Sequence, residues 1–313
     1  MHFYDYHPEK SRFREEVLQG LRRTPKAIPP KFFYDARGSS LFDAITRLPE
    51  YYPTRTEIAI LQQYGGEIGR FAGSGCTLIE LGSGSSTKVR LLLDVLHPVA
   101  YVPVDISRQH LKHSANNLAL AHPHIDVHAV CADYTQPLRL PDDVPEGRRV
   151  IFFPGSSIGN FEPDAALGLL RKIKGLAGKN GALLIGVDLI KSPDILNAAY
   201  NDVSGITERF NLNLLHRINR ELDADFNPAQ FGHKAFYNQD NHRIEMHLAS
   251  SQAQSVCING DRFDFDKRES IHTENSYKYG IDTFGAMARK AGFLTQRVWT
   301  DVDHLFSIHY LAA

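Results

Sequence analysis

Apolar and polar positions alternate in a regular way through the middle of this chain of 313 residues. Short apolar runs, rich in β-branched residues, are separated by stretches in which apolar residues recur with helical spacing. The strand-like runs lie at 77–81, 100–104, 127–130, 149–153 and 182–187, and the helical stretches at 88–96, 107–121 and 163–177. Buried strands that alternate with helices are typical of a parallel, doubly wound sheet. The pattern therefore predicts an α/β fold over about residues 67–189.

The residues after this region follow a different pattern. Two helical stretches are succeeded by strand-like alternation, which indicates an α+β insertion that forms a substrate lid or a second, smaller domain. After this insertion the chain returns to the strand and helix pattern of the α/β region, with a last helix that ends at Gly292 and two closing strands. The helical stretches are 195–200, 206–222 and 281–291, and the strand-like ones are 233–237, 243–249, 255–258, 262–265, 293–300 and 305–311.

The N-terminal segment is dense in aromatic and turn residues. A helix is predicted after Pro8, and Ser39 or Ser40 is the candidate N-cap of a short helix that runs through residue 45. A further helix is predicted at 55–64.

Composition narrows the classes of function. Hydrophobic residues make up 42% of the chain and charged residues 23%, and the formal net charge is −1. A general nucleic-acid binder would carry a basic excess, so we expect no nucleic-acid partner. No apolar run has the length that a membrane span needs, and the polar N-terminus does not resemble a signal peptide, so we expect no membrane partner.

Cysteine and histidine spacing argues against a metal or a disulfide framework. The three cysteines lie far apart without a CxxC pair, and the 15 histidines show no HExxH spacing. We therefore expect no metal, and a reducing compartment, by default the cytoplasm. A monomer is the expected state.

A glycine loop follows the first predicted strand, in the run ELGSG at 80–84. Glycines at a strand end permit positive φ and let a nucleotide-like ligand approach the backbone. The third glycine of a dinucleotide fingerprint is absent, and so is the GxxxxGK[ST] of a P-loop. An S-adenosylmethionine loop remains, and Glu80 just before it would suit the positively charged sulfonium. A turn without a ligand is the alternative.

Two further carboxylates strengthen this interpretation. Asp105 ends the second strand, 25 residues after Glu80, where it can accept hydrogen bonds from both ribose hydroxyls. Asp133 ends the third strand, where it can accept from the adenine amine while Tyr134 lies near the ring. Any one of these acids could be solvated, but three at successive strand ends indicate a cofactor site.

The fourth strand runs into GSSIGNF at 155–161. The Asn/Asp-Pro-Pro-aromatic motif of base-directed methyltransferases is absent there, which argues against a nucleic-acid substrate. The amide of Asn160 instead suits a small polar substrate such as an amino acid.

The chain resembles the histidine-specific N-alpha-methyltransferases of ergothioneine biosynthesis. The resemblance rests on runs spread in order along nearly the whole chain, among them PPKFFYDARGSSLFDAITRLPEYYPTRTE at 29–57, ELGSGSSTK at 80–88, GSSIGN at 155–160, AYNDVSGIT at 199–207 and RIEM at 243–246. It implies a class I, Rossmann-like methyltransferase domain at 56–188 plus 280–313 that binds S-adenosylmethionine. It also implies a smaller α+β substrate domain at 1–55 plus 189–279.

The resemblance also implies roles for individual residues, carried over at matching positions. Tyr34 would lie near the amine as the catalytic tyrosine together with Asn160, and Asn160 and Tyr200 would hold the substrate carboxylate. The imidazole would be recognised by Tyr51, Met246, Glu274 and Ser276, and the cofactor by Gly82, Lys88, Asp105, Asp133 and Tyr134.

The implied reaction is transfer of methyl groups from S-adenosylmethionine to the α-amino group of L-histidine, in succession to trimethylhistidine (hercynine), with S-adenosylhomocysteine as the other product. The alternatives are the same fold acting on another amine, such as tryptophan or an indole amine, and a protein that senses S-adenosylmethionine without catalysis. The polar set around Tyr34 and Tyr200 argues against a sensor.

Overall fold

The computed structural model describes residues 1–6 and 10–313; Pro8, expected to precede the first helix, lies outside them. Contacts within the chain divide it into two compact units. Unit 1 contains residues 1–6, Pro53–Ile190 and Tyr277–Ala313, and unit 2 contains residues 10–52 and Lys191–Ser276. Each unit is described below by itself.

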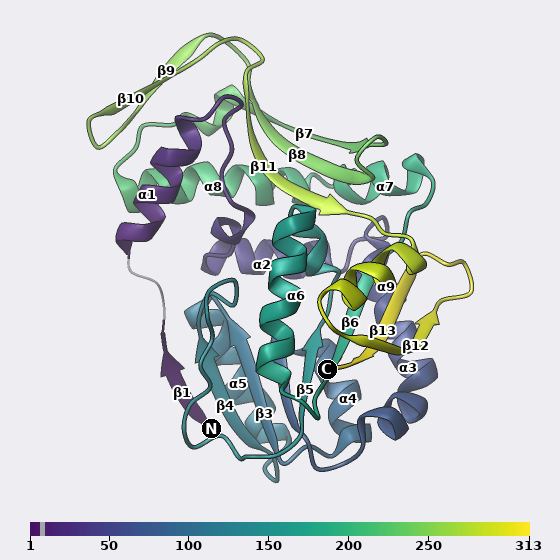
Figure 1. Ribbon diagram of the computed structural model, residues 1–313. Helices are drawn as coiled ribbons and strands as arrows, with labels where there is room; N and C mark the ends of the chain where they lie inside the picture. The colour runs from purple at the N-terminus through teal and green to yellow at the C-terminus, as the bar shows by residue number, and fades with distance from the viewer. Residues whose placement is uncertain (7–9) are drawn as a thin grey trace. The chain divides into compact units, whose positions relative to one another are not determined.

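Unit 1 is built on an eight-stranded sheet (Figure 1). Neighbouring strands are parallel except for β13, which runs antiparallel to both of its neighbours. Strand order places β2 in the middle with later strands on both sides, which is the switch point of a doubly wound sheet. Across the sheet the strands are β1 (His2–Asp5), β4 (Asp126–Cys131), β3 (Ala100–Asp105), β2 (Thr77–Leu81), β5 (Arg149–Phe153), β6 (Ala182–Asp188), β13 (Phe306–Ala312) and β12 (Leu294–Thr300).

Helices cover both faces of this sheet, because the central strands are apolar on both sides. Residues of α3 (Tyr52–Ala72), α4 (Thr87–Leu96) and α5 (Arg108–Ala121) share one buried core with one face of the strands. Residues of α6 (Pro163–Ala177) and α9 (Ile281–Lys290) share the core on the other face. The predicted α/β fold with a doubly wound sheet is confirmed.

Unit 2 is α+β, as expected. The long helix α8 (Ile206–Leu222) contacts α2 (Ala36–Ile45) and the strands β7 (Phe231–Asn238) and β8 (Arg243–Ser250). Strands β11, β8 and β7 form one sheet in that order, and β9 and β10 form a hairpin. The remaining elements are α1 (Lys10–Leu21), the 3-10 helices η1 (Pro30–Phe33) and η3 (Pro228–Gln230), α7 (Pro193–Tyr200), β9 (Gln254–Ile258), β10 (Asp261–Phe265) and β11 (Ser270–Tyr277).

Three local predictions were wrong. Residues 2–5 were assigned to the second domain, but they form β1, which pairs in parallel with β4 in unit 1. The N-cap of α2 is Asp35, whose carboxylate accepts from the backbone N–H of Gly38 at 2.7 Å, and Ser39 and Ser40 lie inside the helix. Residues 270–277 were not expected to be a strand, and they form β11.

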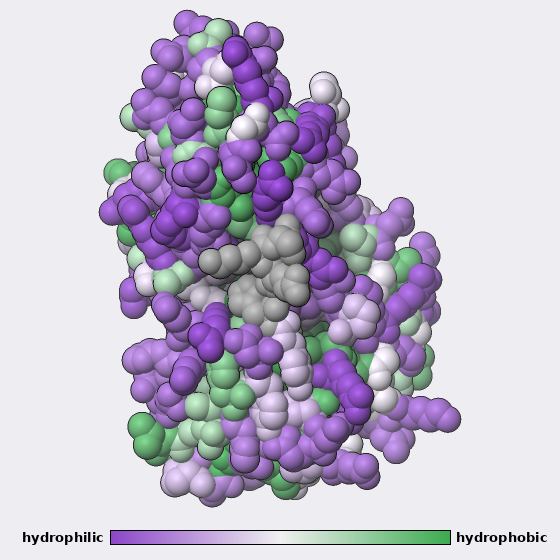
Figure 2. Space-filling view, turned by 90° about the vertical axis from the view of Figure 1, so that its left-hand side faces the viewer, coloured by the Kyte–Doolittle hydropathy of each residue, from purple (hydrophilic) through white to green (hydrophobic). Residues whose placement is uncertain are grey.

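One face of the molecule is mostly polar (Figure 2). Hydrophilic residues cover most of the face in Figure 2, and hydrophobic residues form small separate groups on it. In the part of the chain that the structure describes, no helix has both the length and the apolar composition that crossing a bilayer requires.

Candidate functional site

The glycine loop after β2 turns against the end of the neighbouring strand β3. The backbone N–H groups of Gly82 and Ser83 donate to the carbonyl of Val104 at 2.8 and 3.2 Å. Gly82 has φ 70° and Gly84 φ 48°. L side chains adopt this left-handed region at a steric cost, so the turn favours glycine at both positions. The loop thus leads from the carboxyl end of β2 into α4.

Asp105, at the end of β3, holds this loop in place. One carboxylate oxygen accepts from the N–H of Gly84 at 3.0 Å and the other from the N–H of Ser107 at 2.8 Å. Burial raises the pKa of this carboxyl above its ordinary value. Each oxygen has two lone pairs, so these bonds leave acceptor capacity for a ligand hydroxyl.

Asp133 lies two residues beyond the end of β4 instead of at the strand end as predicted. Its carboxylate accepts from the backbone N–H of Thr135 at 2.9 Å and from the Thr135 hydroxyl at 2.5 Å. The ring of Tyr134 packs edge-on against Phe153, with centroids 5.5 Å apart.

The predicted cofactor residues Gly82, Asp105, Asp133 and Tyr134 lie together. A Cβ on Gly82 would come 3.7 Å from the Tyr134 ring. Burial first, and then the charges of Asp105 and Asp133, raise the pKa of the Tyr134 phenol well above its ordinary value. The phenol therefore stays protonated at neutral pH and remains a hydrogen-bond donor.

Glu80 has a different environment from the one expected beside a sulfonium. Its side chain is 1% exposed, and its carboxyl accepts a hydrogen bond from the Tyr101 hydroxyl. Burial raises the pKa of Glu80 to about 8, against the smaller opposing effects of the Tyr101 hydrogen bond and Lys88. A carboxyl with this pKa is mostly protonated at neutral pH.

Ser83 was missed by the sequence reasoning. Its hydroxyl oxygen is buried within the glycine loop and has no hydrogen-bond partner among the described residues. Leaving a buried hydroxyl unpaired costs about 1–3 kcal/mol. This orphaned group, beside a loop of left-handed glycines and two carboxylates, fits a ligand that carries hydroxyl and amino groups. Its position between Gly82 and Gly84 was the available signal.

A buried carboxylate that the sequence reasoning also missed joins the glycine loop's helix to the loop after β5. Glu57, on α3, is 0% exposed. It accepts from the Lys88 ammonium at 2.5 Å and from the N–H of Gly155 at 3.1 and 2.9 Å. Gly186 makes room for it, since a Cβ there would lie 2.0 Å from the Glu57 carboxylate. The contact that the structure gives Lys88 is therefore this internal ion pair; its predicted cofactor contact stays a prediction.

Asn160 lies at the end of the 3-10 helix η2 (Ser157–Asn160), just after β5. Gly155 and Ser156 turn the chain there with φ 75° and 56°. The Ser156 hydroxyl accepts from the N–H of Asp188 at 2.9 Å, which anchors the turn to β6. Parallel strands end at one edge of the sheet, so Asn160 shares the edge that carries Asp105.

Unit 2 brings the predicted tyrosines together. The ring of Tyr34 contacts Phe42 at 5.7 Å between centroids, and Phe42 contacts Tyr51 at 6.4 Å. Tyr51 contacts Tyr200 at 6.2 Å, and the Tyr200 hydroxyl donates to the Ser276 hydroxyl at 2.8 Å. These contacts link the predicted catalytic residue Tyr34 and three predicted substrate residues into one aromatic and polar cluster.

Met246 and Glu274 lie on the adjacent strands β8 and β11. Met246 is 1% exposed, and its carbonyl accepts from the Thr273 hydroxyl at 3.1 Å. Glu274 is half-buried. It lies on β11 directly after Thr273, whose hydroxyl joins this strand to β8.

Comparisons with known proteins agree along almost the whole chain. The family model described as "Histidine-specific methyltransferase, SAM-dependent" matches residues 13–313. A histidine N-alpha-methyltransferase of Mycobacterium tuberculosis is 41% identical over 298 residues, covering 92% of this chain and 91% of the relative. Ergothioneine biosynthesis protein 1 of Neurospora crassa is 31% identical over 92% of this chain, which spans 33% of that longer protein.

A more distant relative bears on the alternative substrate. A 4-dimethylallyltryptophan N-methyltransferase of Claviceps purpurea is 26% identical, over 92% of this chain and 91% of the relative. The match of the family model to residues 13–313, together with 41% identity to the mycobacterial protein, shows to which family the chain belongs. This chain belongs to the histidine-specific, S-adenosylmethionine-dependent methyltransferase family, and it is an N-methyltransferase.

Proposed function

We propose that this enzyme transfers methyl groups from S-adenosylmethionine to the α-amino group of L-histidine, in succession to trimethylhistidine (hercynine), the first step of ergothioneine biosynthesis. The observation that carries the proposal is the 41% identity to a histidine N-alpha-methyltransferase over nearly the full length of both chains. The aromatic and polar cluster of unit 2 supports a substrate with a flat polar ring.

The proposed cofactor residues all belong to unit 1. The glycine loop with Gly82 admits the ligand close to the backbone, Asp105 accepts from the ribose hydroxyls, and Asp133 and Tyr134 contact the adenine. Lys88 is also proposed as a cofactor residue. It lies in the first turn of α4, directly after the glycine loop, and its ion pair with Glu57 fixes the position of that helix. Bound S-adenosylmethionine supplies an electrophilic methyl group on a sulfonium.

The proposed substrate residues position histidine. Asn160 and Tyr200 hold the carboxylate, and Tyr51, Met246, Glu274 and Ser276 receive the imidazole. The hydrogen bond from Tyr200 to Ser276 fixes both hydroxyls relative to each other. Holding the amine about 3–3.5 Å from the methyl carbon, in line with the bond that breaks, is the main catalytic contribution.

Tyr34 orients the amine, directly or through water. An amine that attacks must be neutral, so a proton leaves it before each transfer. An ordinary tyrosine, with a pKa of about 10, is a weak base at neutral pH. Loss of the proton to solvent before binding is equally compatible with this arrangement.

Replacing Ser83 by alanine should weaken cofactor binding and leave stability unchanged or higher. The hydroxyl is unpaired within the described chain, so its removal costs the free protein nothing, whereas a bound ligand loses a hydrogen bond. We expect the Kd for S-adenosylmethionine to rise about five- to tenfold in calorimetry. Ser85→Ala is the control, because Ser85 is exposed. Equal Kd values in wild type and Ser83→Ala would remove Ser83 from the site.

Replacing Glu274 by alanine should cost histidine affinity and leave cofactor affinity unchanged. A lost hydrogen bond to a charged group costs about 1.5–3 kcal/mol, or roughly 10- to 100-fold in Kd. Glu208→Ala, on the exposed side of α8, is the matched control in unit 2. Equal losses for both ligands in calorimetry would contradict the assignment.

One assay tests the reaction as a whole. The enzyme is incubated with methyl-labelled S-adenosylmethionine and each free amino acid, and labelled trimethylhistidine is sought by mass spectrometry. Label in tryptophan or an indole amine instead would favour the alternative that the Claviceps purpurea relative represents.

The same proposal includes no metal in the reaction, a small-molecule substrate without nucleic-acid or membrane partners, and a monomer in the cytoplasm. The formal charge of −1 and the three widely spaced cysteines support it. Unchanged turnover in the presence of a chelator and a single-chain mass in sedimentation would be the expected results.

A further inference from the structure

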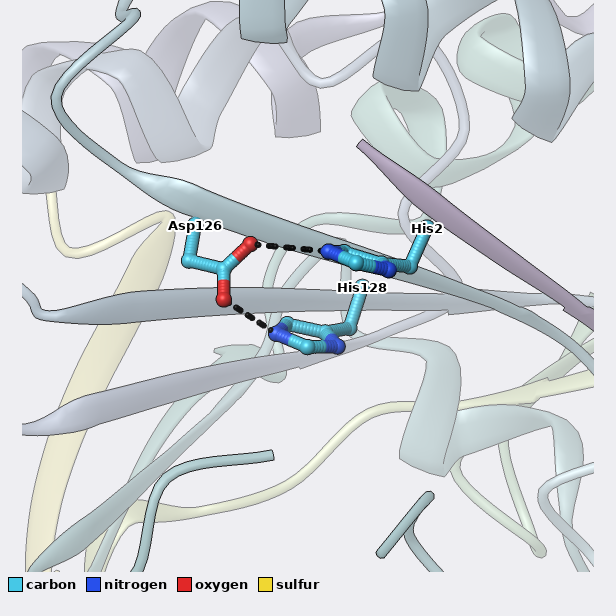
Figure 3. A group of neighbouring side chains, drawn as sticks. All are labelled: His2, Asp126 and His128. Atoms are coloured by element: carbon cyan, nitrogen blue, oxygen red, sulfur yellow. Dashed lines mark hydrogen bonds and ion pairs between the residues drawn. The ribbon is translucent and has the colours of Figure 1, made fainter. Parts of the chain in front are cut away.

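Two histidines that are far apart in sequence lie side by side at one edge of the unit 1 sheet. His2 on β1 is in register with His128 on the neighbouring parallel strand β4. Asp126 precedes His128 by two residues, so its side chain points to the same face of β4. Figure 3 shows the Asp126 carboxylate facing both imidazole rings.

The three side chains present their ligand atoms to one small volume. The imidazoles are stacked, with centroids 4.8 Å apart and an angle of 11° between the rings. Asp126 lies 3.5 Å from Nε2 of His2 and 2.8 Å from Nε2 of His128. One ligand atom from each residue lies within 4.8 Å of the other two. These are the nitrogen and oxygen donors that zinc-class cations prefer.

A second carboxylate lies on the opposite side of both rings. Asp143 is 3.7 Å from Nδ1 of His2 and 3.7 Å from Nδ1 of His128. The Tyr4 hydroxyl donates a hydrogen bond to Asp143. Histidines that bind a metal usually direct their other ring nitrogen to a carboxylate, which fixes the tautomer and the ring orientation. The cluster therefore has a ligand set, and the Asp143 carboxylate lies within ion-pair distance of the other nitrogen of both rings.

We propose that His2, Asp126 and His128 bind a divalent cation of the zinc class. The cation is held by Nε2 of each imidazole and by the carboxylate, with water completing the coordination. It offsets the charge of the two carboxylates that face the rings. His128 is buried and gives a fixed ligand, whereas the His2 side chain is 52% exposed and can tilt from the stack to close on the ion.

The position of the cluster separates this cation from the methyl transfer. Asp126 and His128 lie at the amino end of β4, and Asp133 follows its carboxyl end. Each residue of a strand advances about 3.3 Å, so the cluster lies toward the amino end of β4 and the proposed cofactor residues lie beyond the carboxyl ends of the strands. The role we assign to the cation is to clamp the edge strand β1 onto β4, consistent with a reaction that needs no metal.

A second group of two histidines and a carboxylate, in unit 2, differs because an arginine already neutralises its carboxylate. Glu245, His247 and His272 in unit 2 also have ligand atoms near one another. There, however, the Arg243 guanidinium lies 2.8 Å from the Glu245 carboxylate and already neutralises it. A cation would have to displace this arginine, so we assign no site to that group.

The test uses untagged full-length enzyme that has been stripped with a chelator and then titrated with Zn²⁺, and separately with Co²⁺ as a spectroscopic probe. We expect one ion per chain, visible absorption of bound Co²⁺ that Zn²⁺ displaces, and a higher Tm with Zn²⁺. His2→Ala and Asp126→Asn alter exposed residues, so folding should survive. Each should weaken binding at least tenfold, and Asp143→Asn about tenfold.

His124→Ala is the matched control, because His124 is an exposed histidine just before β4. It should bind Zn²⁺ as the wild type does. Absence of Zn²⁺ binding by the wild type, unchanged affinity in both His2→Ala and Asp126→Asn, or an equal loss in His124→Ala would each overturn the proposal. Failure of the methyltransferase assay would not affect it, since binding is measured without either substrate.

Discussion

Replacing Glu57 by alanine is expected to lower the free energy of unfolding by about 3–5 kcal/mol. The variant leaves the Lys88 ammonium without its carboxylate and the backbone N–H of Gly155 without its acceptor. The carboxylate is fully buried, and the Lys88 side chain is 16% exposed. Removing one member of a buried pair is costly because the remaining charge stays desolvated. The same change should reduce cofactor affinity, since Glu57 joins α4 to the loop after β5.

Urea unfolding of the two proteins measures this loss. Glu57→Gln should fall between the wild type and the alanine variant, because an amide oxygen can still accept from Gly155. Asp142→Asn is the surface control, since the pair it forms with Arg139 is 85–88% exposed. An exposed pair contributes about 0–1 kcal/mol. If Glu57→Ala lowered the free energy of unfolding no more than this control does, the contacts of Glu57 with Lys88 and Gly155 would not stabilise the fold.

The second large expected effect is a pH dependence of the free energy of unfolding that Glu80 causes. The pKa of this carboxyl is about 8 in the folded protein and takes its ordinary value of 4.5 when the chain unfolds. Between these two values the folded protein holds a proton that the unfolded chain releases. The free energy of unfolding therefore falls as the pH rises from 4.5 to 8, by up to about 1.4 kcal/mol per pH unit and by roughly 4 kcal/mol in all.

Glu80→Gln should remove this dependence. The glutamine carbonyl can still accept from the Tyr101 hydroxyl and never ionises, so its environment stays satisfied at every pH. Urea unfolding of both proteins at several pH values between 5 and 8 should show the variant gaining on the wild type as the pH rises. If the free energies of unfolding of the wild type and of Glu80→Gln changed with pH in the same way, the pKa of Glu80 would be the same in the folded and unfolded chains, which would contradict the prediction.

The sheet, and the grouping of Gly82, Asp105 and Asp133 near the carboxyl ends of its strands, could be predicted from the chain because their signals are local. The apolar runs at 77–81 and 100–104 became β2 and β3 at the positions expected. A positive φ at Gly82 and an acid after each strand are properties of a few consecutive residues, so Asp105 and Asp133 could be placed near the loop in advance. The long runs that carry the family resemblance led to Tyr51 and Tyr200 in the same way.

Contacts between distant segments were not predictable. Four residues such as those of β1 are too few to show a periodicity, and they become a strand only because β4 offers an unpaired edge. Asp35 caps the helix in place of Ser39 because its backbone is extended there, with φ −80° and ψ −178°, and its carboxylate reaches the N–H of Gly38.

The sequence by itself determined the alternation of strands and helices, the glycine loop and the family, since each depends on neighbouring residues or on long matching runs. Only the tertiary structure decided the state of Glu80, the burial of Glu57 and the meeting of His2 with His128. The physical reason is the same in all three cases. The energy of a charged or polar side chain depends on its desolvation and on partners that folding supplies from elsewhere in the chain.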